Sequence, residues 1–144
     1  MALFDRPTAR QIDLGLAILH VIAGVIFFAH GYQKVFEFGF SGVAGFFGQI
    51  GVPASGFTGP AIGILELVGG LALILGLFTR VFGFLLACDM LGAIFFVHAK
   101  GGFFVPKGIE FVMALCAMAI TLGIAGGGGF SVDAIIARRR GSAV

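Results

Sequence analysis

The segment GPAIGILELVGGLALILGLF, residues 59–78, consists of apolar residues and glycines and contains one charged residue, Glu66. A run of about 20 such residues is long enough to cross the hydrocarbon core of a membrane as an α-helix. A carboxylate in hydrocarbon is energetically costly unless it is paired or protonated. The segment therefore predicts a transmembrane helix in which Glu66 has a partner, a proton or a functional role.

The rest of the chain shares this apolar character. Of its 144 residues, 59% are hydrophobic and only 11% are charged, and the mean hydropathy is +1.12. A soluble domain of this size could not remove so much apolar surface from water. The net charge of +2 gives no indication of nucleic-acid binding. We therefore expect residues 1–144 to form a single membrane domain whose main partner is the lipid bilayer.

Helix start and stop signals divide the chain into four apolar segments near spanning length, and the prediction is an all-α bundle of four transmembrane helices. Asp13 is expected to cap the first segment and Pro60 to begin the second. Pro106 and Gly108 precede the fourth. The predicted spans are residues 13–33, 60–79, 80–99 and 109–127.

Lysine and arginine residues predict the orientation, because they are enriched in the cytoplasmic loops of membrane proteins. With both termini inside, the basic residues on the cytoplasmic side are Arg6, Arg10, Arg80, Arg138, Arg139 and Arg140, and those outside are Lys34, Lys100 and Lys107. This distribution favours a multi-pass protein of the bacterial inner membrane with both termini in the cytoplasm.

The basic cytoplasmic tail, residues 128–144, is expected to form a short helix with Ser131 as its N-cap and Asp133 in its first turn. Arg138, Arg139 and Arg140 would then lie at the cytoplasmic leaflet, where anionic lipids are the expected contacts.

The loop between the first two spans contains a helical apolar pattern. Val43, Phe46, Phe47 and Ile50 fall at positions i, i+3, i+4 and i+7. We expect a short amphipathic helix on the outer membrane interface, with Ser41 as its cap. Such a helix could cover the mouth of the bundle as a lid or simply fill its outer surface.

A short sequence similarity relates the two halves of the chain. Residues 24–30 read GVIFFAH and residues 92–98 read GAIFFVH. This similarity suggests two helix hairpins of common origin, related by an axis along the membrane normal.

The two hairpins place several ionisable residues in the outer half of the bundle. His30, His98 and Glu110 fall near the outer helix ends. Glu66 is expected at a depth of ~9 Å and Asp89 at ~14 Å, from the rise of a helix per residue. Ionisable residues within a membrane usually face a bundle interior or a wet cavity and mark function.

Three interpretations of this polar cluster remain open. A structural interpretation pairs Glu66 with Lys34 and His30 with Glu110, which fixes helix packing without chemistry. A binding interpretation places a quinone-like molecule in the cluster, with histidine and lysine as donors, a carboxylate as proton carrier and phenylalanines as walls. A metal site of His30, His98, Glu66 and Glu110 is a weak alternative, because no close ligand spacing supports it.

Passage of an ion or small molecule, with Asp89 as a proton relay, is a further alternative. Four short helices leave little room for a channel unless the protein oligomerises. Cys88 and Cys116 lie in apolar runs outside any C-x-x-C arrangement, and we interpret them as small core residues.

Small residues predict where helices approach each other, since close packing of glycines is a main source of helix association in lipid. Gly31 in the first span and Gly69, Gly70 and Gly76 in the second are the expected contact positions.

Taken together, these motifs resemble the DoxX family of small bacterial membrane proteins. The resemblance rests on HGYQKVF (residues 30–36), ELVGGLALILGLFTR (residues 66–80), His98, Glu110 and the terminal GGGGFSVD. It implies a four-helix inner-membrane protein linked to quinone, thiol and oxidative-stress metabolism. It also adds Gln33, so that the candidate ligand-binding residues are His30, Gln33, Lys34, Glu66, Asp89, His98 and Glu110.

The resemblance supports a quinone ligand but does not make this chain an enzyme alone. The sequence contains no dinucleotide fingerprint, haem-attachment motif or redox cysteine pair, so no covalently bound cofactor is expected. We expect an accessory or anchor subunit of a quinone-linked oxidoreductase complex, or a homo-oligomer, and the catalytic residues remain unknown.

Overall fold

A computed structural model describes residues 5–141, and all the regular structure in this range is helical. The helices are α1 (Ala9–Tyr32), α2 (Gly39–Gln49), α3 (Ser55–Leu75), α4 (Thr79–Ala93), α5 (Glu110–Ala125) and α6 (Val132–Gly141). Two of them continue into a π-helical turn, α1 through Gln33–Glu37 and α4 through Ile94–His98. The all-α prediction is confirmed over the described residues.

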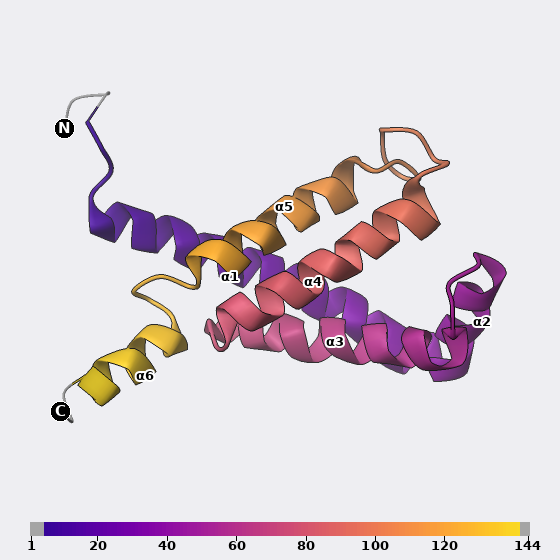
Figure 1. The fold of residues 1–144 in the computed structure, drawn as a ribbon, viewed down its shortest axis with the longest axis horizontal. Coiled ribbons are helices and arrows are strands. Elements are labelled where there is room, and N and C mark those ends of the chain that lie inside the picture. The colour runs from indigo at the N-terminus through magenta and orange to yellow at the C-terminus, as the bar shows by residue number, and fades with distance from the viewer. Residues whose placement is uncertain (1–4, 142–144) are drawn as a thin grey trace.

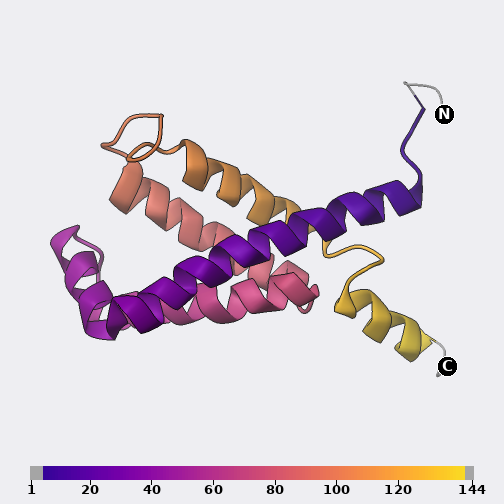
Figure 2. The ribbon, with the colours of Figure 1, turned by 180° about the vertical axis from the view of Figure 1, so that it is seen from behind.

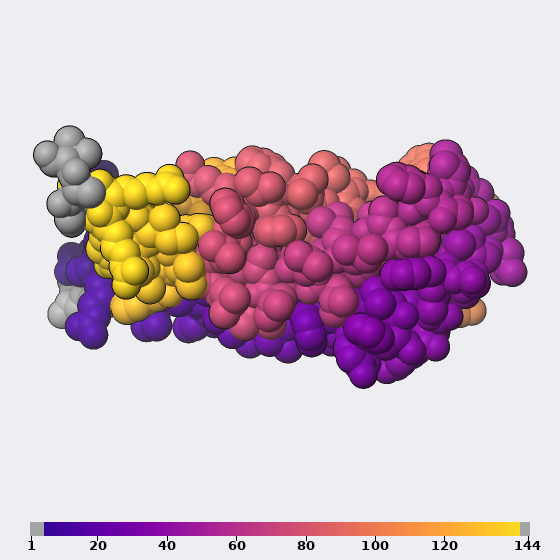
Figure 3. Space-filling view, turned by 90° about the horizontal axis from the view of Figure 1, so that it is seen from below, coloured from indigo at the N-terminus to yellow at the C-terminus, as the bar shows by residue number. Residues whose placement is uncertain are grey.

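Four long helices run alternately in opposite directions and form two pairs (Figure 1). The most extensive contacts join α1 to α3 and α4 to α5, and the contacts between the pairs are fewer. The two pairs diverge toward the end that carries α2, as both ribbon views show (Figures 1 and 2). The short helix α6 lies at the opposite end, where α4 begins (Figure 3).

Three helical segments of residues 5–141 are long and apolar enough to cross a membrane: Ala9–Glu37, Ser55–Leu75 and Thr79–His98. The fourth apolar helix, α5, has 16 residues, and its length of about 24 Å falls short of a typical hydrocarbon core. The predicted count of four spans therefore stays a prediction.

The start of α1 differs from the prediction. Thr8 is the N-cap: its hydroxyl accepts a hydrogen bond from the Gln11 N–H at 3.3 Å, and the Gln11 side chain accepts one from the Thr8 N–H at 2.8 Å. This reciprocal pair is a capping box, and it starts the helix at Ala9. Asp13 is therefore not the cap, and its carboxylate accepts a hydrogen bond from the N–H of Gly129 in the tail.

Two further predicted helix starts are wrong. Pro60 lies inside α3, because the carbonyl of Ala54 accepts hydrogen bonds from the N–H groups of Phe57 and Thr58 and begins the helix earlier. Pro60 is the sixth residue of α3, beyond the first N–H groups that have no helical partner, so the helix continues across a residue that cannot donate a backbone hydrogen bond. Ser41 likewise lies inside α2, which begins at Gly39.

Glycines allow close contact within each helix pair. A Cβ atom added to Gly31 would overlap the backbone of Leu67, and one added to Gly70 would overlap the backbone of Phe28. In the other pair, a Cβ on Gly83 would lie 2.5 Å from the backbone N of Gly123. Both helix pairs therefore depend on positions where no side chain fits.

Two other predicted glycines have different neighbours. A Cβ on Gly69 would lie 3.0 Å from the ring of Phe82, which places this glycine against α4. Gly76 ends α3 with a φ of 66°, and a Cβ there would lie 2.5 Å from Cβ of Ser131 in the tail. Gly76 therefore serves the end of α3 and the docking of the tail rather than a helix–helix contact.

The short helix α2 occupies the loop in which a helix was predicted. Val43 is buried, and a Cβ on Gly59 of α3 would lie 2.9 Å from the backbone N of Ala44. These contacts fix α2 against α3. Its placement on the outer membrane interface and the origin of the two hairpins by duplication remain predictions.

Candidate binding pocket between the helix pairs

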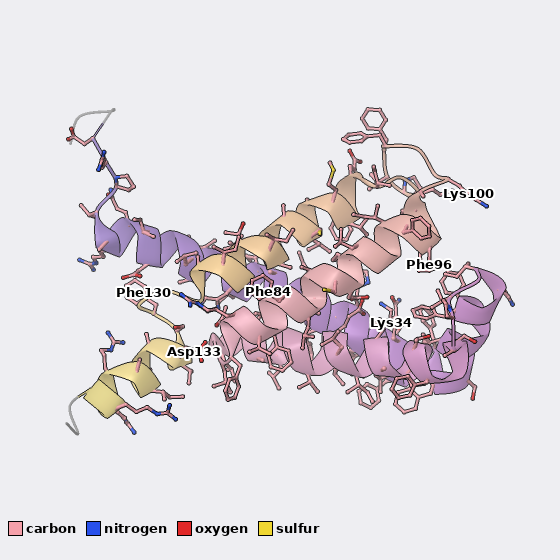
Figure 4. All side chains as sticks on the ribbon, in the orientation of Figure 1. Lys34, Phe84, Phe96, Lys100, Phe130 and Asp133 are labelled. Atoms are coloured by element: carbon pink, nitrogen blue, oxygen red, sulfur yellow. The ribbon has the colours of Figure 1, made fainter. Side chains whose placement is uncertain are left out.

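The diverging helix pairs enclose a cavity of about 1090 Å³. Its walls come from α1, α2, α3, α4 and α5, and they are mainly apolar. The aromatic part of the lining consists of Phe27, Phe38, Phe46, Phe47, Phe96 and Phe111. Lys34 and Phe96 enter the space between the pairs from opposite sides (Figure 4). All four residues of the predicted apolar pattern of α2, Val43, Phe46, Phe47 and Ile50, belong to the lining.

An ion pair between Lys34 and Glu66 lies on the wall of this cavity. Nζ of Lys34 donates a hydrogen bond to Oε2 of Glu66. Glu66 is only 3% exposed. The lysine comes from the π-helical turn after α1 and the glutamate from the middle of α3. The predicted pairing of these two residues is therefore present, and it gives Glu66 the partner that its buried position requires.

Asp89 of α4 reaches the same place from the other helix pair. Its carboxyl group lies within hydrogen-bonding reach of Glu66. Its Oδ2 atom is buried and has no hydrogen-bond partner in the structure. Two acidic side chains and one lysine, from three different helical segments, therefore meet on one wall of the cavity.

The corrected start of α3 explains why Glu66 and Asp89 meet. Because α3 begins at Ser55, Glu66 lies eleven residues into the helix, a depth of ~16 Å rather than the ~9 Å expected from a start at Pro60. This depth is close to the ~14 Å expected for Asp89 from its distance to His98 along α4.

The other predicted ligand residues divide into two groups. His30, Gln33 and His98 line the cavity. The ring of His30 lies 6.2 Å from the ring of Phe111, and Nδ1 of His98 lies 3.0 Å from the carbonyl oxygen of Lys107. These three residues are thus at the cavity wall, with the ion pair.

Glu110 is not among the lining residues. Its Oε1 accepts a hydrogen bond from the N–H of Val105 at 2.7 Å, so it orders the loop before α5 rather than pairing with His30. Over residues 5–141, no three His, Cys, Asp or Glu side chains are grouped so that they could hold a metal ion. The weak alternative of a metal site of His30, His98, Glu66 and Glu110 therefore has no geometric support.

The two cysteines have different environments. Cys116 is buried, as expected, and its Sγ lies 3.8 Å from the carbonyl oxygen of Ala87. Cys88 is exposed and lines the cavity. The interpretation of Cys88 as a core residue is therefore wrong. The ionisable residue Asp89 directly follows Cys88 in the sequence and also lines the cavity. Its presence in an apolar helix was the indication that this part of α4 faces a cavity.

A second polar cluster, at the α6 end of the molecule, was not predicted. The Asp133 carboxylate accepts hydrogen bonds at 2.8 Å from the N–H groups of both Phe78 and Thr79, where α4 begins. Ser131 caps α6 as predicted, accepting a hydrogen bond from the Ala134 N–H at 3.2 Å. One indication in the sequence was that the residues directly before Thr79 include no Ser, Thr, Asn or Asp that could cap the start of α4. The cap therefore had to come from another part of the chain.

Fold and composition define an all-helical membrane protein with an apolar pocket, and comparison with known proteins gives its family. The DoxX family model matches residues 15–99, and this chain belongs to the DoxX family. A Bacillus subtilis protein named "Putative oxidoreductase CatD" is 36% identical over 113 residues, which cover 78% of this chain and 81% of that protein.

Two other relatives extend the comparison. An uncharacterized protein of Haemophilus influenzae is 34% identical over 122 residues, covering 82% of this chain and 87% of its own. The Escherichia coli inner membrane protein YqjF is 26% identical over 132 residues, covering 88% of this chain and 95% of its own. No solved structure matches this chain.

Proposed function

We propose that this DoxX-family protein binds a quinone-like molecule in the cavity between its helix pairs and acts as an accessory or anchor subunit in membrane redox metabolism. The observation that carries the proposal is that one large, aromatic-walled cavity contains an ion pair between the partly buried Lys34 and the buried Glu66. A flat ring with oxygen atoms and an apolar tail matches this combination of walls and donors.

The cavity has the size and chemistry of a ligand site. Small-molecule pockets usually measure about 300–1,000 Å³ and are mostly apolar with a few convergent polar groups. Here the cavity measures about 1090 Å³. Lys34, Gln33 and His30 can donate hydrogen bonds to ligand oxygens. The six phenylalanines of the lining provide faces against which a ring can stack.

The comparison with relatives favours the same class of function. The Bacillus subtilis relative carries the name of an oxidoreductase. Since the present sequence has no motif for a dinucleotide or a haem, a partner subunit would supply the prosthetic group. The proposal places the protein in the bacterial inner membrane with both termini in the cytoplasm, so that the cavity is in the outer half.

A direct test is binding of decylubiquinone or menadione to the purified protein in nanodiscs, followed by native mass spectrometry. The Gly92→Leu substitution gives the sharpest control, because Gly92 lines the cavity and a Cβ there meets nothing within 4 Å. A leucine would fill part of the cavity without disturbing the fold. We expect affinity to fall at least about tenfold, equivalent to about 1.4 kcal/mol.

Gly15→Leu is the matched control. Gly15 also has nothing within 4 Å of an added Cβ and does not line the cavity. Binding should be unchanged in this variant. Equal binding by both variants, or no quinone binding by the native protein, would reject the cavity as a quinone site.

The ion pair between Lys34 and the buried Glu66 also favours a purely structural role as the second candidate. On this view Lys34 and Glu66 fix the packing of α1 on α3 and the cavity holds only lipid tails. Glu66→Gln separates the candidates, because an amide still accepts a hydrogen bond from Lys34. A binding role predicts a normal fold with weakened quinone binding, and a structural role predicts a lower unfolding temperature with no quinone binding in either protein.

The accessory role is tested separately from the ligand. The protein purified alone should show no quinone reductase activity with a dithiol or nicotinamide donor, and it should copurify with a soluble or peripheral subunit from mild detergent. Flux of a solute into proteoliposomes that contain this chain alone would instead support the transport alternative.

A further inference from the structure

The cavity lining contains two carboxylic acids but one permanent cation. Its ionisable side chains are His30 and Lys34 from α1 and its π-helical turn, Glu66 from α3, Cys88 and Asp89 from α4, and His98 from the turn after α4. The lining residues from α2 and α5 are apolar or glycine. One permanent cation therefore faces two carboxylic acids.

The geometry shows which acid is compensated. Lys34 forms its ion pair with Glu66, through Oε2. Asp89 approaches Glu66 within hydrogen-bonding reach, and Oδ2 of Asp89 is buried without a partner. Two ionised carboxylates have no hydrogen atom to place between them, so this approach is favourable only when one of them carries a proton.

We infer that Glu66 and Asp89 hold a single proton between them, carried on Asp89, and that Asp89 donates it to Glu66 while the cavity is empty and to an oxygen atom of the ligand once one is bound. The shared proton makes the cluster of Lys34, Glu66 and Asp89 electrically neutral, as an apolar site requires. The second half of this inference rests on the proposed quinone ligand, whereas the first half concerns the protein alone.

The arrangement gives the pocket a ligand preference. Lys34 stays paired with Glu66, and the protonated Asp89 acts as a donor at the cavity wall. A ligand with a carbonyl oxygen can accept this hydrogen bond, whereas a hydrocarbon tail cannot. An anionic ligand is less favoured, because Glu66 already occupies the lysine. The expected ligand class is thus a neutral carbonyl compound.

Infrared spectroscopy tests the shared proton without any ligand. A protonated carboxylic acid has a C=O stretching band that is well separated from the bands of carboxylates. The native protein in nanodiscs at neutral pH should show such a band, with a shift in D₂O. Asp89→Asn should abolish it, because Glu66 then remains ionised beside Lys34. Glu37→Gln, at an exposed acid outside the cavity, should leave it unchanged.

Glu66→Gln provides a second variant in case Asp89→Asn fails to fold. The new amide can donate to Asp89, so the proton is no longer required and the band should again be lost. Absence of the band from the native protein, or its survival in Asp89→Asn, would overturn the inference.

Added menadione or decylubiquinone tests the ligand half. A shift of the Asp89 band on addition of the quinone is the expected result. A band that is present, depends on Asp89 and stays unshifted would overturn the ligand contact while leaving the shared proton established. Loss of quinone binding in Gly92→Leu with the band intact would show that the two claims are separable.

Discussion

The carboxylate of Asp133 in α6 accepts a hydrogen bond from the N–H of Thr79, 54 residues earlier, at 2.8 Å. Its other oxygen accepts one from Phe78 at the same distance. The first N–H groups of a helix have no partner inside the helix, so a residue of the tail supplies the cap that α4 lacks. The same contact docks α6 onto the bundle.

Replacement of Asp133 should therefore destabilise the bundle although this residue is far from the cavity. Loss of an N-cap typically costs about 0.5–2 kcal/mol. We expect Asp133→Ala to lower the free energy of unfolding by about 1–2 kcal/mol and Asp133→Asn by less, because an amide oxygen still accepts one bond. Unfolding in detergent mixtures measures both. An unchanged stability in Asp133→Ala would show that the contact is incidental.

The contact between α1 and α3 should be very sensitive at Gly31 and insensitive at Gly15. A Cβ on Gly31 would overlap the backbone of Leu67, whereas one on Gly15 meets nothing within 4 Å. Overpacking against backbone typically costs about 1–3 kcal/mol, and alanine is otherwise favoured over glycine in a helix by about 0.5–1 kcal/mol. Gly31→Ala should lower thermal stability and Gly15→Ala should keep or raise it. Equal stabilities would contradict the close approach of α1 to α3 at Gly31.

The Lys34–Glu66 ion pair should show strong energetic coupling. Lys34→Met removes the partner of a glutamate that is 3% exposed, and breaking a buried pair typically costs about 3–5 kcal/mol. Lys34→Met combined with Glu66→Gln should recover most of this loss, since no charge is then stranded. A double-mutant cycle of unfolding free energies measures the coupling, and a value near zero would show that the pair is solvent-screened.

The predicted orientation can be tested with single cysteines. In a background with Cys88 and Cys116 replaced by alanine, Gln49→Cys at the end of α2 and Gly141→Cys at the end of α6 are both exposed. A membrane-impermeant maleimide added to intact cells should label the cysteine at position 49 and leave the one at 141 unlabelled until the membrane is opened. The reverse pattern would place α6 outside.

The basic end of α6 should select anionic lipids. Arg139 and Arg140 are exposed, and each basic residue near an anionic leaflet contributes about 1 kcal/mol. Arg138 is kept unchanged in this test because its Nη2 donates to the carbonyl of Gly129 at 3.1 Å. Replacing Arg139 and Arg140 with glutamine should reduce the phosphatidylglycerol retained in native mass spectra. Lys100→Gln and Lys107→Gln, in the loop before α5, form the control pair with the same charge change.

Sequence patterns predicted those features that depend on nearby residues. Apolar periodicity located α2, and the Ser131 cap of α6 followed from a local preference. The pairing of Lys34 with Glu66 was expected in one of the three interpretations, because a carboxylate within a membrane needs a partner. Pro60 misled the prediction of the α3 start because proline usually occupies the first position of a helix, whereas α3 begins five residues earlier and continues across it.

Contacts between distant segments could not be predicted in the same way. The meeting of Asp89 with Glu66 depends on the rotation of α3 and α4 about their axes, and residue spacing alone does not determine it. The contact of Asp13 with Gly129 spans 116 residues and follows from the path of a glycine-rich turn. Glu110 was expected at the cavity because it lies at the correct depth, yet the loop N–H of Val105 binds it.

The cap that Asp133 supplies to α4 also has a consequence for biosynthesis. Because helix α4 emerges from the ribosome 54 residues before its capping carboxylate, its first turn must remain hydrated or frayed until the tail has been translated. A chain that ends before Asp133 therefore lacks the carboxylate that satisfies the N–H groups of Phe78 and Thr79.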